Sequence, residues 1–464
     1  MVWANFLHFY QPPTQKPYWI TRIAKESYRP IVEGLLAHPG AKITLNISAV
    51  LLEQLDRYDQ GDIITGLRTL LERGQIELTG SAKYHALLPF LPEAEARRQI
   101  RLNQQVLRHY FGEAYQPAGF FPPEMAVTPE IMPLIRDEGF RWVIADEYSC
   151  PGGPEAIRYD QRYLVKGAEG LEIYFRERRV SWSILAGELG TPSLVKAHLG
   201  QRLQRPGFLL TAMDGETFGH HRPGLENLLF DLADEKELPT TLISELSTKF
   251  THATTIEPRP STWAFMDKTL ERSAPFIRWR DPDNTIHAEQ WELLGLALAA
   301  CPHHDDPTAP REDMLDRALH SDQFWWASAR PWWSIEMIEA GAKELMDAIA
   351  ASPDATTAQR QQAETHYRHI LAQAFDWQRS GKVDELARRD DEELRQAAGT
   401  HTKLPRAEVE AMVKRLRRDM HTAANREDFE RAASLRDRIR ELDNLAGDTD
   451  AVELGQTGTQ DWNH

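Results

Sequence analysis

The stretch FLLTAMDGETFGHH (residues 208–221) decides how this chain must fold. It begins as a largely apolar run of strand length and then ends abruptly in polar groups: Asp214, Gly215, Glu216, His220 and His221. Barrel enzymes collect their chemistry at the carboxyl ends of their strands. The stretch therefore indicates either half of an active site or a crowded polar turn.

Six further strand-like runs precede it. They are VWANFLHF (2–9), KITLNIS (42–48), QIELTG (75–80), AGFF (118–121), WVIADE (142–147) and LEIYF (171–175). Helix-like stretches lie between most of them, for example at 97–111 and 131–140. Strands that alternate with helices predict an α/β fold, either a parallel sheet or a closed barrel of about seven strands.

Most of these runs end near side chains that can do chemistry. In chain order these are His8 and Gln11, Glu77 and His85, Glu124, Asp146 and Glu147, and Asp214. We expect Glu77 to make a structural hydrogen bond. The others are candidates for the mouth of a barrel, where parallel strands bring their carboxyl ends together.

Composition limits the class of protein. The 464 residues carry a net charge of −16, with 41% hydrophobic and 27% charged residues, which is typical of a soluble globular chain. The acidic balance argues against nucleic acid as a partner, because phosphate binding needs a basic face. No apolar run reaches the length of a membrane span. With two cysteines and no signal-like segment near the N-terminus, we expect a cytoplasmic protein.

The chain changes character after about residue 255. We predict a catalytic barrel over 1–255, a helical domain over 256–400 that completes the cleft, a helical hairpin over 401–446 and a flexible tail over 447–464. In the helical domain, Trp325, Trp326, Trp332 and Trp333 are candidates to line the cleft, whereas Trp263 and Trp279 are expected in the core.

Two apolar stripes with helical spacing predict the hairpin at 405–445. The first contains Val409, Val413, Leu416 and Met420, and the second contains Phe429, Ala432, Leu435, Ile439 and Leu442. Asn425 is a plausible turn, and Asp428 lies close to the start of the second helix. Two short amphipathic helices cannot bury much alone, so the hairpin should dock on itself, on the neighbouring domain or on a partner.

Two carboxyl groups at one barrel mouth point to glycosidic bond cleavage, in which one donates a proton and the other attacks or stabilises the sugar cation. Glu124, in GFFPPEMAVTPE, follows a strand, and Pro122 and Pro123 stiffen its approach. Asp214 ends another strand. Their separation along the chain leaves the distance between them, and therefore retention or inversion, open.

Four motifs and two helical segments, in chain order, resemble glycoside hydrolase family 57, whose members are retaining enzymes active on α-glucans with an incomplete (β/α)7 barrel. They are LHFYQPP, GQIELTGSAKYHALLP, GFFPPEMAVTPE and LLTAMDGETFG, followed by the helical segments DNTIHAEQWEL and SDQFWW. The resemblance covers residues 1–335. It implies that Glu124 is the nucleophile, that Asp214 is the acid/base, and that neither metal nor cofactor takes part.

Several residues at the predicted barrel mouth, and one in the helical segments expected to close over it, are candidates for substrate contact. These candidates are His8, Gln11, His85, Glu216, His220, His221 and Trp325. The chain departs from the family pattern at Tyr10, where members commonly carry histidine before Gln-Pro, and at Ala86, after His85. These departures bear on the substrate and leave the two carboxylates untouched.

The segment AANREDFERAASLRDRIREL is similar to the UVR motif of bacterial nucleotide-excision-repair proteins, which serves protein–protein docking. It suggests a protein partner or self-association through the hairpin, and does not imply DNA repair.

Two other functions stay open at this point. A metal-dependent polysaccharide deacetylase could take ligands from His8, Asp214, His220 and His221. A non-catalytic scaffold could bind glycan and relay that binding through the hairpin. The sequence leaves the linkage, the choice of water or sugar as acceptor, and the oligomeric state undecided.

Overall fold

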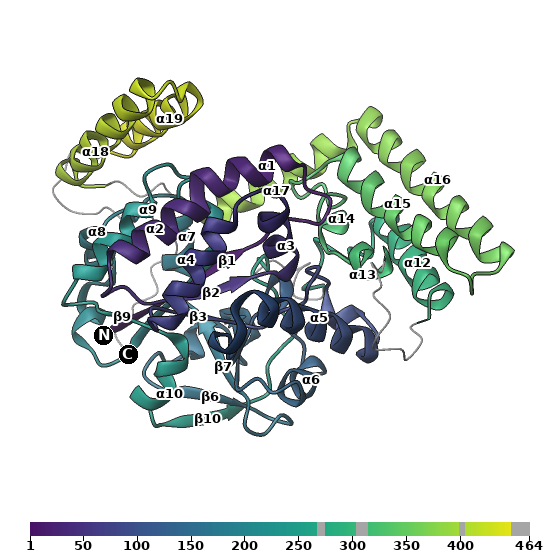
Figure 1. Cartoon of the computed structure of the whole chain (residues 1–464), viewed down its shortest axis with the longest axis horizontal. Coiled ribbons are helices and arrows are strands. Elements are labelled where there is room, and N and C mark those ends of the chain that lie inside the picture. The colour runs from purple at the N-terminus through teal and green to yellow at the C-terminus, as the bar shows by residue number, and fades with distance from the viewer. Residues whose placement is uncertain (267–273, 303–313, 399–403, 447–464) are drawn as a thin grey trace.

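A computed structural model describes residues 1–266, 274–302, 314–398 and 404–446 (Figure 1). The tail expected at 447–464 lies outside these residues. Within the described part of the chain, no helix combines the length and the apolar character needed to cross a membrane.

All seven expected strands are present. They are β1 (Val2–Phe9), β2 (Ile43–Ile47), β3 (Ile76–Leu78), β4 (Gly119–Phe120), β5 (Trp142–Asp146), β7 (Glu172–Arg176) and β8 (Phe208–Asp214). Four of them pair in parallel in the order β3-β2-β1-β8, and β4, β5 and β7 pair in parallel in a second sheet. Because strands covered on both faces are apolar almost throughout, β1 is buried over nearly its whole length.

The two sheets join into an incomplete (β/α)7 barrel, as expected. Gly80, just after β3, bridges in parallel to Phe120 of β4, and its N–H donates to the carbonyl of Gly119 at 2.8 Å. A Cβ at Gly80 would lie 2.2 Å from the ring of Phe140, so only glycine allows this approach. At the other seam, the N–H of Glu177 after β7 donates to the carbonyl of Leu210 in β8 at 2.6 Å.

Three short strands extend the sheets beyond the expected seven. They are β6 (Arg162–Val165), β9 (Thr240–Thr241) and β10 (Ala253–Ile256). Strand β9 pairs with β1, whereas β6 runs antiparallel to β7 and carries β10 on its other edge. They lie at the margins of the barrel, away from the strand ends that carry the candidate residues.

Helices surround the barrel. They are α1 (Pro17–Ile23), α2 (Arg29–Ala37), α3 (Ala49–Arg57), α4 (Gly61–Glu72), α5 (Glu93–Phe111), α6 (Ile131–Asp137), α7 (Arg178–Leu185), α8 (Pro192–Leu199), α9 (Glu226–Asp231) and α10 (Leu246–Lys249). Between α1 and α2 the chain forms one π-helical turn, η1 (Ala24–Tyr28). Such turns are frequent at functional sites.

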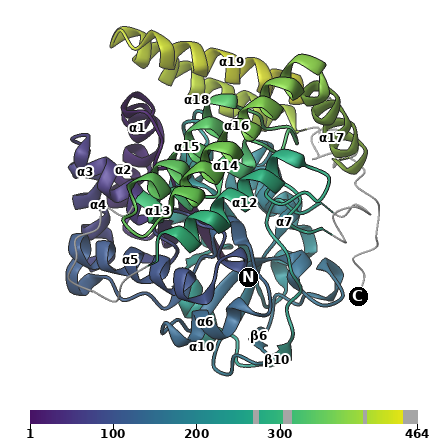
Figure 2. The ribbon, with the colours of Figure 1, turned by 90° about the vertical axis from the view of Figure 1, so that its right-hand side faces the viewer.

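A helical region follows the barrel and lies on one side of it (Figures 1 and 2). Its helices are α12 (Thr285–Ala300), α13 (Met314–Ala318), α14 (Asp322–Trp325), α15 (Ile335–Ala351), α16 (Thr357–Ser380) and α17 (Lys382–Ala398). Local capping fixes where they start: Asn284 caps α12, and Thr356 forms a capping box with Gln359 at the start of α16. Trp279 is buried in this region, as expected.

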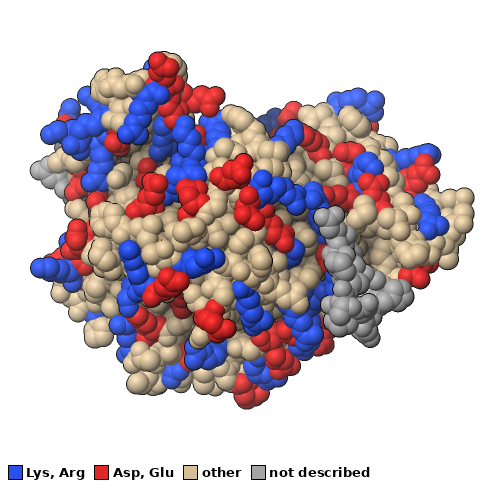
Figure 3. All heavy atoms as spheres, viewed as in Figure 1, with Lys and Arg blue, Asp and Glu red and all other residues tan. Residues whose placement is uncertain are grey.

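The predicted hairpin consists of α18 (Arg406–Asn425) and α19 (Phe429–Leu445), which pack against each other along one side of the barrel (Figures 1 and 2). Asp428 caps α19 by accepting from the N–H of Arg431. Most of the apolar stripe joins the core of the barrel. Phe429 is an exception, because it is 68% exposed at the first residue of α19. On the face shown in Figure 3, Lys and Arg side chains gather over this hairpin.

Candidate active site

The candidate residues meet at one edge of the barrel. Asp214 is the last residue of β8, and its Cα pairs in register with that of His8 in β1. Glu124 follows β4 directly, in a short 3-10 turn at Pro123–Met125. The parallel strands therefore bring together the groups that the sequence predicted at the barrel mouth.

Glu124 has an unusual backbone. Its φ of 60° and ψ of 18° lie in the left-handed region, which non-glycine residues rarely occupy. The carbonyl of Glu124 accepts from the N–H of Trp263 at 3.2 Å. Backbone strain of this kind persists where the surrounding structure enforces it, and it clusters at active sites.

The carboxyl group of Glu124 is buried among polar partners. Its Oε2 accepts from the indole N–H of Trp263 at 2.8 Å, and Oε1 lies 3.7 Å from Nδ1 of His85. Burial, together with the negative charges of Asp322 and Asp214, raises the pKa of Glu124 to about 8, although hydrogen bonds from Trp263 and Ser321 act in the opposite direction. Burial also lowers the pKa of His85 to about 4, so its ring is neutral at pH 7.

Asp214 is the second buried carboxyl group. Burial raises its pKa to about 6, and the positive charge of Arg176 partly offsets this. Arg176, in β7, donates to Asp146 at 2.8 Å and to the carbonyl of Trp263 at 2.7 Å. The pKa of Glu124 is therefore the higher of the two, which favours a proton on Glu124 over one on Asp214.

A column of aromatic rings lines the site. The ring of Tyr10 stacks on that of His85 with centroids 4.0 Å apart, His8 stacks on His85 at 5.0 Å, and Phe121 lies 4.5 Å from His8. Nδ1 of His8 bonds Oδ1 of Asn46 at 2.8 Å. The Nε2 atoms of both histidines are buried and have no hydrogen-bond partner among the described residues. Buried polar atoms without partners are costly, so these two favour a ligand with hydroxyl groups.

Glu216 and Gln11, both expected to contact substrate, bind each other. Oε1 of Glu216 accepts from Nε2 of Gln11 at 3.1 Å and from the hydroxyl of Tyr28. Burial, followed by the charge of Asp214, raises the pKa of Glu216 to about 8. These contacts hold Glu216 beside Asp214 and favour a positioning role for it.

The helical region supplies groups that sequence reasoning did not single out. Asp322, the first residue of α14, accepts from the hydroxyl of Tyr10 at 2.5 Å and lies 3.2 Å from Nδ1 of His320. Burial alone would lower the pKa of His320, but Asp322 and Glu344 raise it to about 9. His320 is therefore a buried cation at neutral pH. The sequence contained a signal for Asp322, because SDQFWW places this one carboxylate beside a cluster of aromatic residues.

Other predictions fall less centrally. His220 binds Glu26 through Nδ1 at 2.5 Å, and His221 is exposed. Trp325 stacks on Trp279 at 5.1 Å, one helical turn from Asp322. Trp263, expected in the core, packs against it but remains partly exposed and turns its N–H toward Glu124.

Glu77 makes the structural hydrogen bonds expected of it. It accepts from the hydroxyl of Thr44 at 2.7 Å and from the N–H of Ser244 at 3.1 Å. The metal-ligand set considered for a deacetylase gains no geometric support, because His220 is turned to Glu26. Throughout the described ranges, no group of three or more His, Cys, Asp or Glu side chains is arranged to hold a metal ion.

Comparison with known families matches residues 9–257 to the model described as glycosyl hydrolase family 57, and residues 410–445 to the UvrB/uvrC motif. An α-amylase of Pyrococcus horikoshii is 32% identical over 185 residues, which are 39% of this chain and 29% of that protein. A 4-α-glucanotransferase of Thermococcus litoralis is 28% identical over 142 residues, 31% of this chain and 21% of that protein. The chain thus spans less than a third of the length of these relatives.

Solved structures support the same fold. The 4-α-glucanotransferase of Thermococcus litoralis aligns with a TM-score of 0.58 at 18% identity, over 75% of this chain and 59% of that one. A family 57 branching enzyme of Thermococcus kodakaraensis aligns with a TM-score of 0.54 at 16% identity, over 81% of this chain and 96% of that one.

Proposed function

Because the chain belongs to glycosyl hydrolase family 57, we propose that it cleaves or transfers α-glucans by a retaining double displacement, with Glu124 as nucleophile and Asp214 as acid/base. One observation carries the assignment: these two buried carboxyl groups follow strands of the same barrel and are close enough for the charge of Asp214 to raise the pKa of Glu124. The proposed reaction needs one carboxylate and one carboxylic acid.

In the first half-reaction, the Glu124 carboxylate attacks the anomeric carbon of the sugar. The bond from that carbon to the glycosidic oxygen breaks, and Asp214 gives its proton to the departing oxygen. The products of this step are a glycosyl ester on Glu124 and a free sugar hydroxyl.

In the second half-reaction, a water molecule or a sugar hydroxyl attacks the same carbon. Its proton passes to the Asp214 carboxylate, the ester bond breaks and Glu124 is regenerated as a carboxylate. Water as the acceptor gives hydrolysis, and a sugar hydroxyl gives transfer or branching. Both carboxyl groups end as they began, so neither a metal nor a cofactor is required by this sequence of steps.

The reactive protonation state is the minor one before substrate binds. The pKa values of about 8 for Glu124 and about 6 for Asp214 favour a proton on Glu124. Developing positive charge on the sugar favours the ionised form of Glu124, and the glycosidic oxygen accepts a hydrogen bond only from protonated Asp214.

We infer that the ring column binds the sugar. The Nε2 atoms of His8 and His85 are buried and face no protein partner among the residues described, so they can bond sugar hydroxyls. Tyr10 stacks on His85 and is held by Asp322, which fixes its ring at the position where the family commonly has histidine. The substrate class rests on the relatives, which are named as α-amylases, a 4-α-glucanotransferase and a branching enzyme.

The test is product analysis with amylose and maltooligosaccharides. Wild type should release shorter glucans, or longer or branched ones if it transfers, and Glu124→Gln and Asp214→Asn should release none. Glu169→Gln is the matched control, because Glu169 is an exposed carboxylate with a side chain 84% accessible. Activity that survives in Glu124→Gln contradicts the assignment.

Proton NMR of the first product tests the stereochemistry. Retention gives the α-anomer first, and inversion gives the β-anomer. A glycan-binding scaffold predicts a different pattern: no turnover of any glucan by wild type, and undiminished glucan binding by Glu124→Gln.

A further inference from the structure

The hairpin lies against the segment that carries the proposed acid. The side chain of Arg431 in α19 donates to the carbonyl of Gly219, five residues after Asp214, and its second nitrogen lies 3.3 Å from Glu226. The Arg431 side chain is only 19% exposed. We call residues 214–222 the acid loop.

Gly219 also lies close to the turn η1. Its φ is +103°, and a Cβ there would lie 2.1 Å from the carbonyl oxygen of Glu26 in η1. Any side chain at this position would therefore push the acid loop away from η1. Gly219 thus contacts both the π-helical turn and Arg431.

The π-helical turn η1 binds both the acid loop and the hairpin. The hydroxyl of Ser27 donates to the carbonyl of Gly215 at 3.0 Å, and Tyr28 donates to Glu216. Lys25 of the same turn bonds Asp428, the residue that caps α19, at 2.6 Å. Contacts thus connect the start of α19 to the residues that directly follow Asp214.

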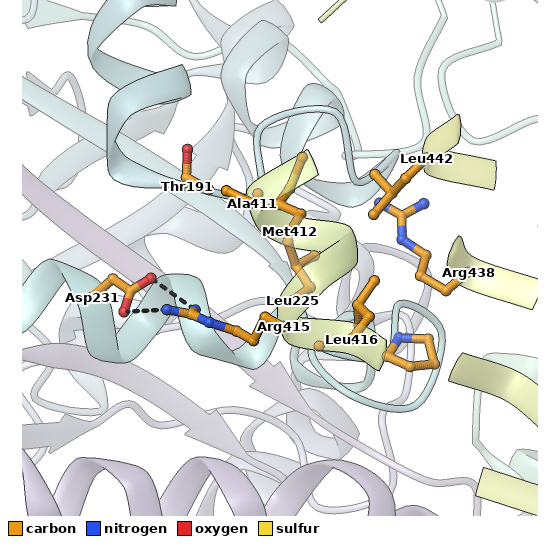
Figure 4. A pocket seen from close by; sticks show the side chains of 12 residues that line it. Thr191, Leu225, Asp231, Ala411, Met412, Arg415, Leu416, Arg438 and Leu442 are labelled. Carbon is orange, nitrogen blue, oxygen red and sulfur yellow. Dashed lines mark hydrogen bonds and ion pairs between the residues drawn. The ribbon is translucent and has the colours of Figure 1, made fainter. Parts of the chain in front are cut away.

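Polar contacts accompany the apolar packing at this interface. Figure 4 shows a hollow between α18 and the barrel, with about 570 Å³ of empty space that is partly open to solvent. Met412, Leu416 and Leu442 line it, and Arg415 reaches across to Asp231 at 3.0 Å. Arg438, farther along α19, donates to the carbonyl of Gly187 at 2.7 Å.

We propose that the hairpin is a clamp that positions the acid loop, with Arg431 as its main positioning residue. By fixing Gly219 against η1, Arg431 holds the Asp214–Glu216 turn in the orientation that protonates the departing oxygen. The inference rests on the proposed function for its catalytic consequence. It assigns to the hairpin a role within its own chain, whatever else docks there.

The experiment compares Arg431→Ala, Arg431→Lys and Arg440→Ala in the full chain. Arg440 is the matched control, because it lies on the same helix with its side chain 72% exposed. Two quantities are measured: kcat and KM on a maltooligosaccharide, and the amide hydrogen exchange of peptides that cover 214–222. Exchange in β1 and β2 reports whether the barrel stays folded.

We expect Arg431→Ala to lower kcat by about 10- to 100-fold, because misplacing a catalytic group by about 1 Å costs that much. KM should change less, and the acid loop should exchange faster while β1 and β2 do not. Arg431→Lys should restore part of both effects, since one donor still reaches Gly219. Should Arg431→Ala fail to fold, Arg431→Lys carries the test with a smaller effect. Arg440→Ala should behave as wild type.

Unchanged exchange over 214–222 in Arg431→Ala would overturn the clamp, and so would faster exchange with an unchanged kcat. If wild type turns over no glucan, the proposed function fails. The exchange measurement then still decides whether Arg431 holds the loop, so the two failures are distinguishable.

Discussion

The indole N–H of Trp263 donates to Oε2 of Glu124 at 2.8 Å, and the backbone N–H of the same tryptophan donates to the carbonyl of Glu124 at 3.2 Å. Trp263 therefore fixes both ends of the proposed nucleophile. It lies beyond residue 257, where the match to the family model ends. A segment outside the matched barrel thus helps to stabilise the ionised form of Glu124.

We expect Trp263→Phe to raise the pKa of Glu124 above its value of about 8, because the N–H stabilises the carboxylate. A hydrogen bond to a charged group is worth about 1.5–3 kcal/mol, so kcat/KM near pH 7 should fall by about 10- to 100-fold. The alkaline limb of the pH profile should move to higher pH. Trp332→Phe is the control, because Trp332 is exposed. An unmoved alkaline limb would contradict this role.

The two carboxyl groups should give a bell-shaped pH profile of kcat/KM, with limbs near the pKa values of about 6 and about 8. Below the lower value both groups are protonated and no nucleophile exists, whereas above the higher value both are ionised and no acid exists. Because the two carboxyl groups interact, each limb of the profile reports the titration of the pair and not of one residue. A profile that stays flat from pH 5 to 9, well beyond both limbs, would be inconsistent with the pair.

Asp214→Asn should lower the pKa of Glu124, because the charge of Asp214 helps to raise it. The titration can be followed by carbon NMR of the protein labelled at glutamate carboxyl groups. Glu169→Gln should leave the Glu124 signal unchanged. A Glu124 pKa that is equal in Asp214→Asn and wild type would mean that the two carboxyl groups do not interact.

Tyr10→Phe should weaken the connection between the barrel and the helical region. It removes the hydroxyl that donates to Asp322 at 2.5 Å and leaves the ring stacked on His85. Losing a hydrogen bond to a buried carboxylate should lower the free energy of unfolding by about 1.5–3 kcal/mol. Chemical denaturation measures the change. Tyr18→Phe, at an exposed tyrosine, is the control and should have no comparable effect.

His320 should make stability depend on pH. Its pKa in the folded chain is about 9, above the ordinary value of 6.5, so its stabilisation is fully present below pH 6.5 and is lost as the pH rises toward 9. The difference in unfolding free energy between wild type and His320→Gln should reach about 3 kcal/mol at pH 6 and shrink at alkaline pH. A difference that grows with pH would show that His320 is not held as a cation.

The barrel could be predicted because apolar runs and polar strand ends follow a simple repeat. The strands that sequence reasoning missed lack an apolar run: β9 is only Thr240–Thr241, and β10 (ATTI) is largely polar with two exposed residues. Periodicity also misplaced Phe429. Its spacing places it in the apolar stripe. In the structure it is the first residue of α19, beyond the surface that the helix covers, so its side chain is exposed.

The candidate site was predictable only in part. Glu124 and Asp214 could be found because each follows a strand. Asp322 and Trp263 reach the site through tertiary packing, from segments whose distance to the barrel no local pattern encodes. Gln11 and Glu216 were both predicted to contact substrate. Their hydrogen bond to each other could not be predicted, because it depends on how the ends of β1 and β8 lie side by side.

The acid loop lies between η1 and α19, so groups from near both ends of the chain hold it. On the ribosome, Asp214 and its neighbours leave the exit tunnel long before Arg431 is made. A newly made barrel therefore holds its acid loop from the η1 side alone, and the second support arrives only with α19. For the clamp we propose, the synthesis of α19 is also the step that completes the catalytic geometry.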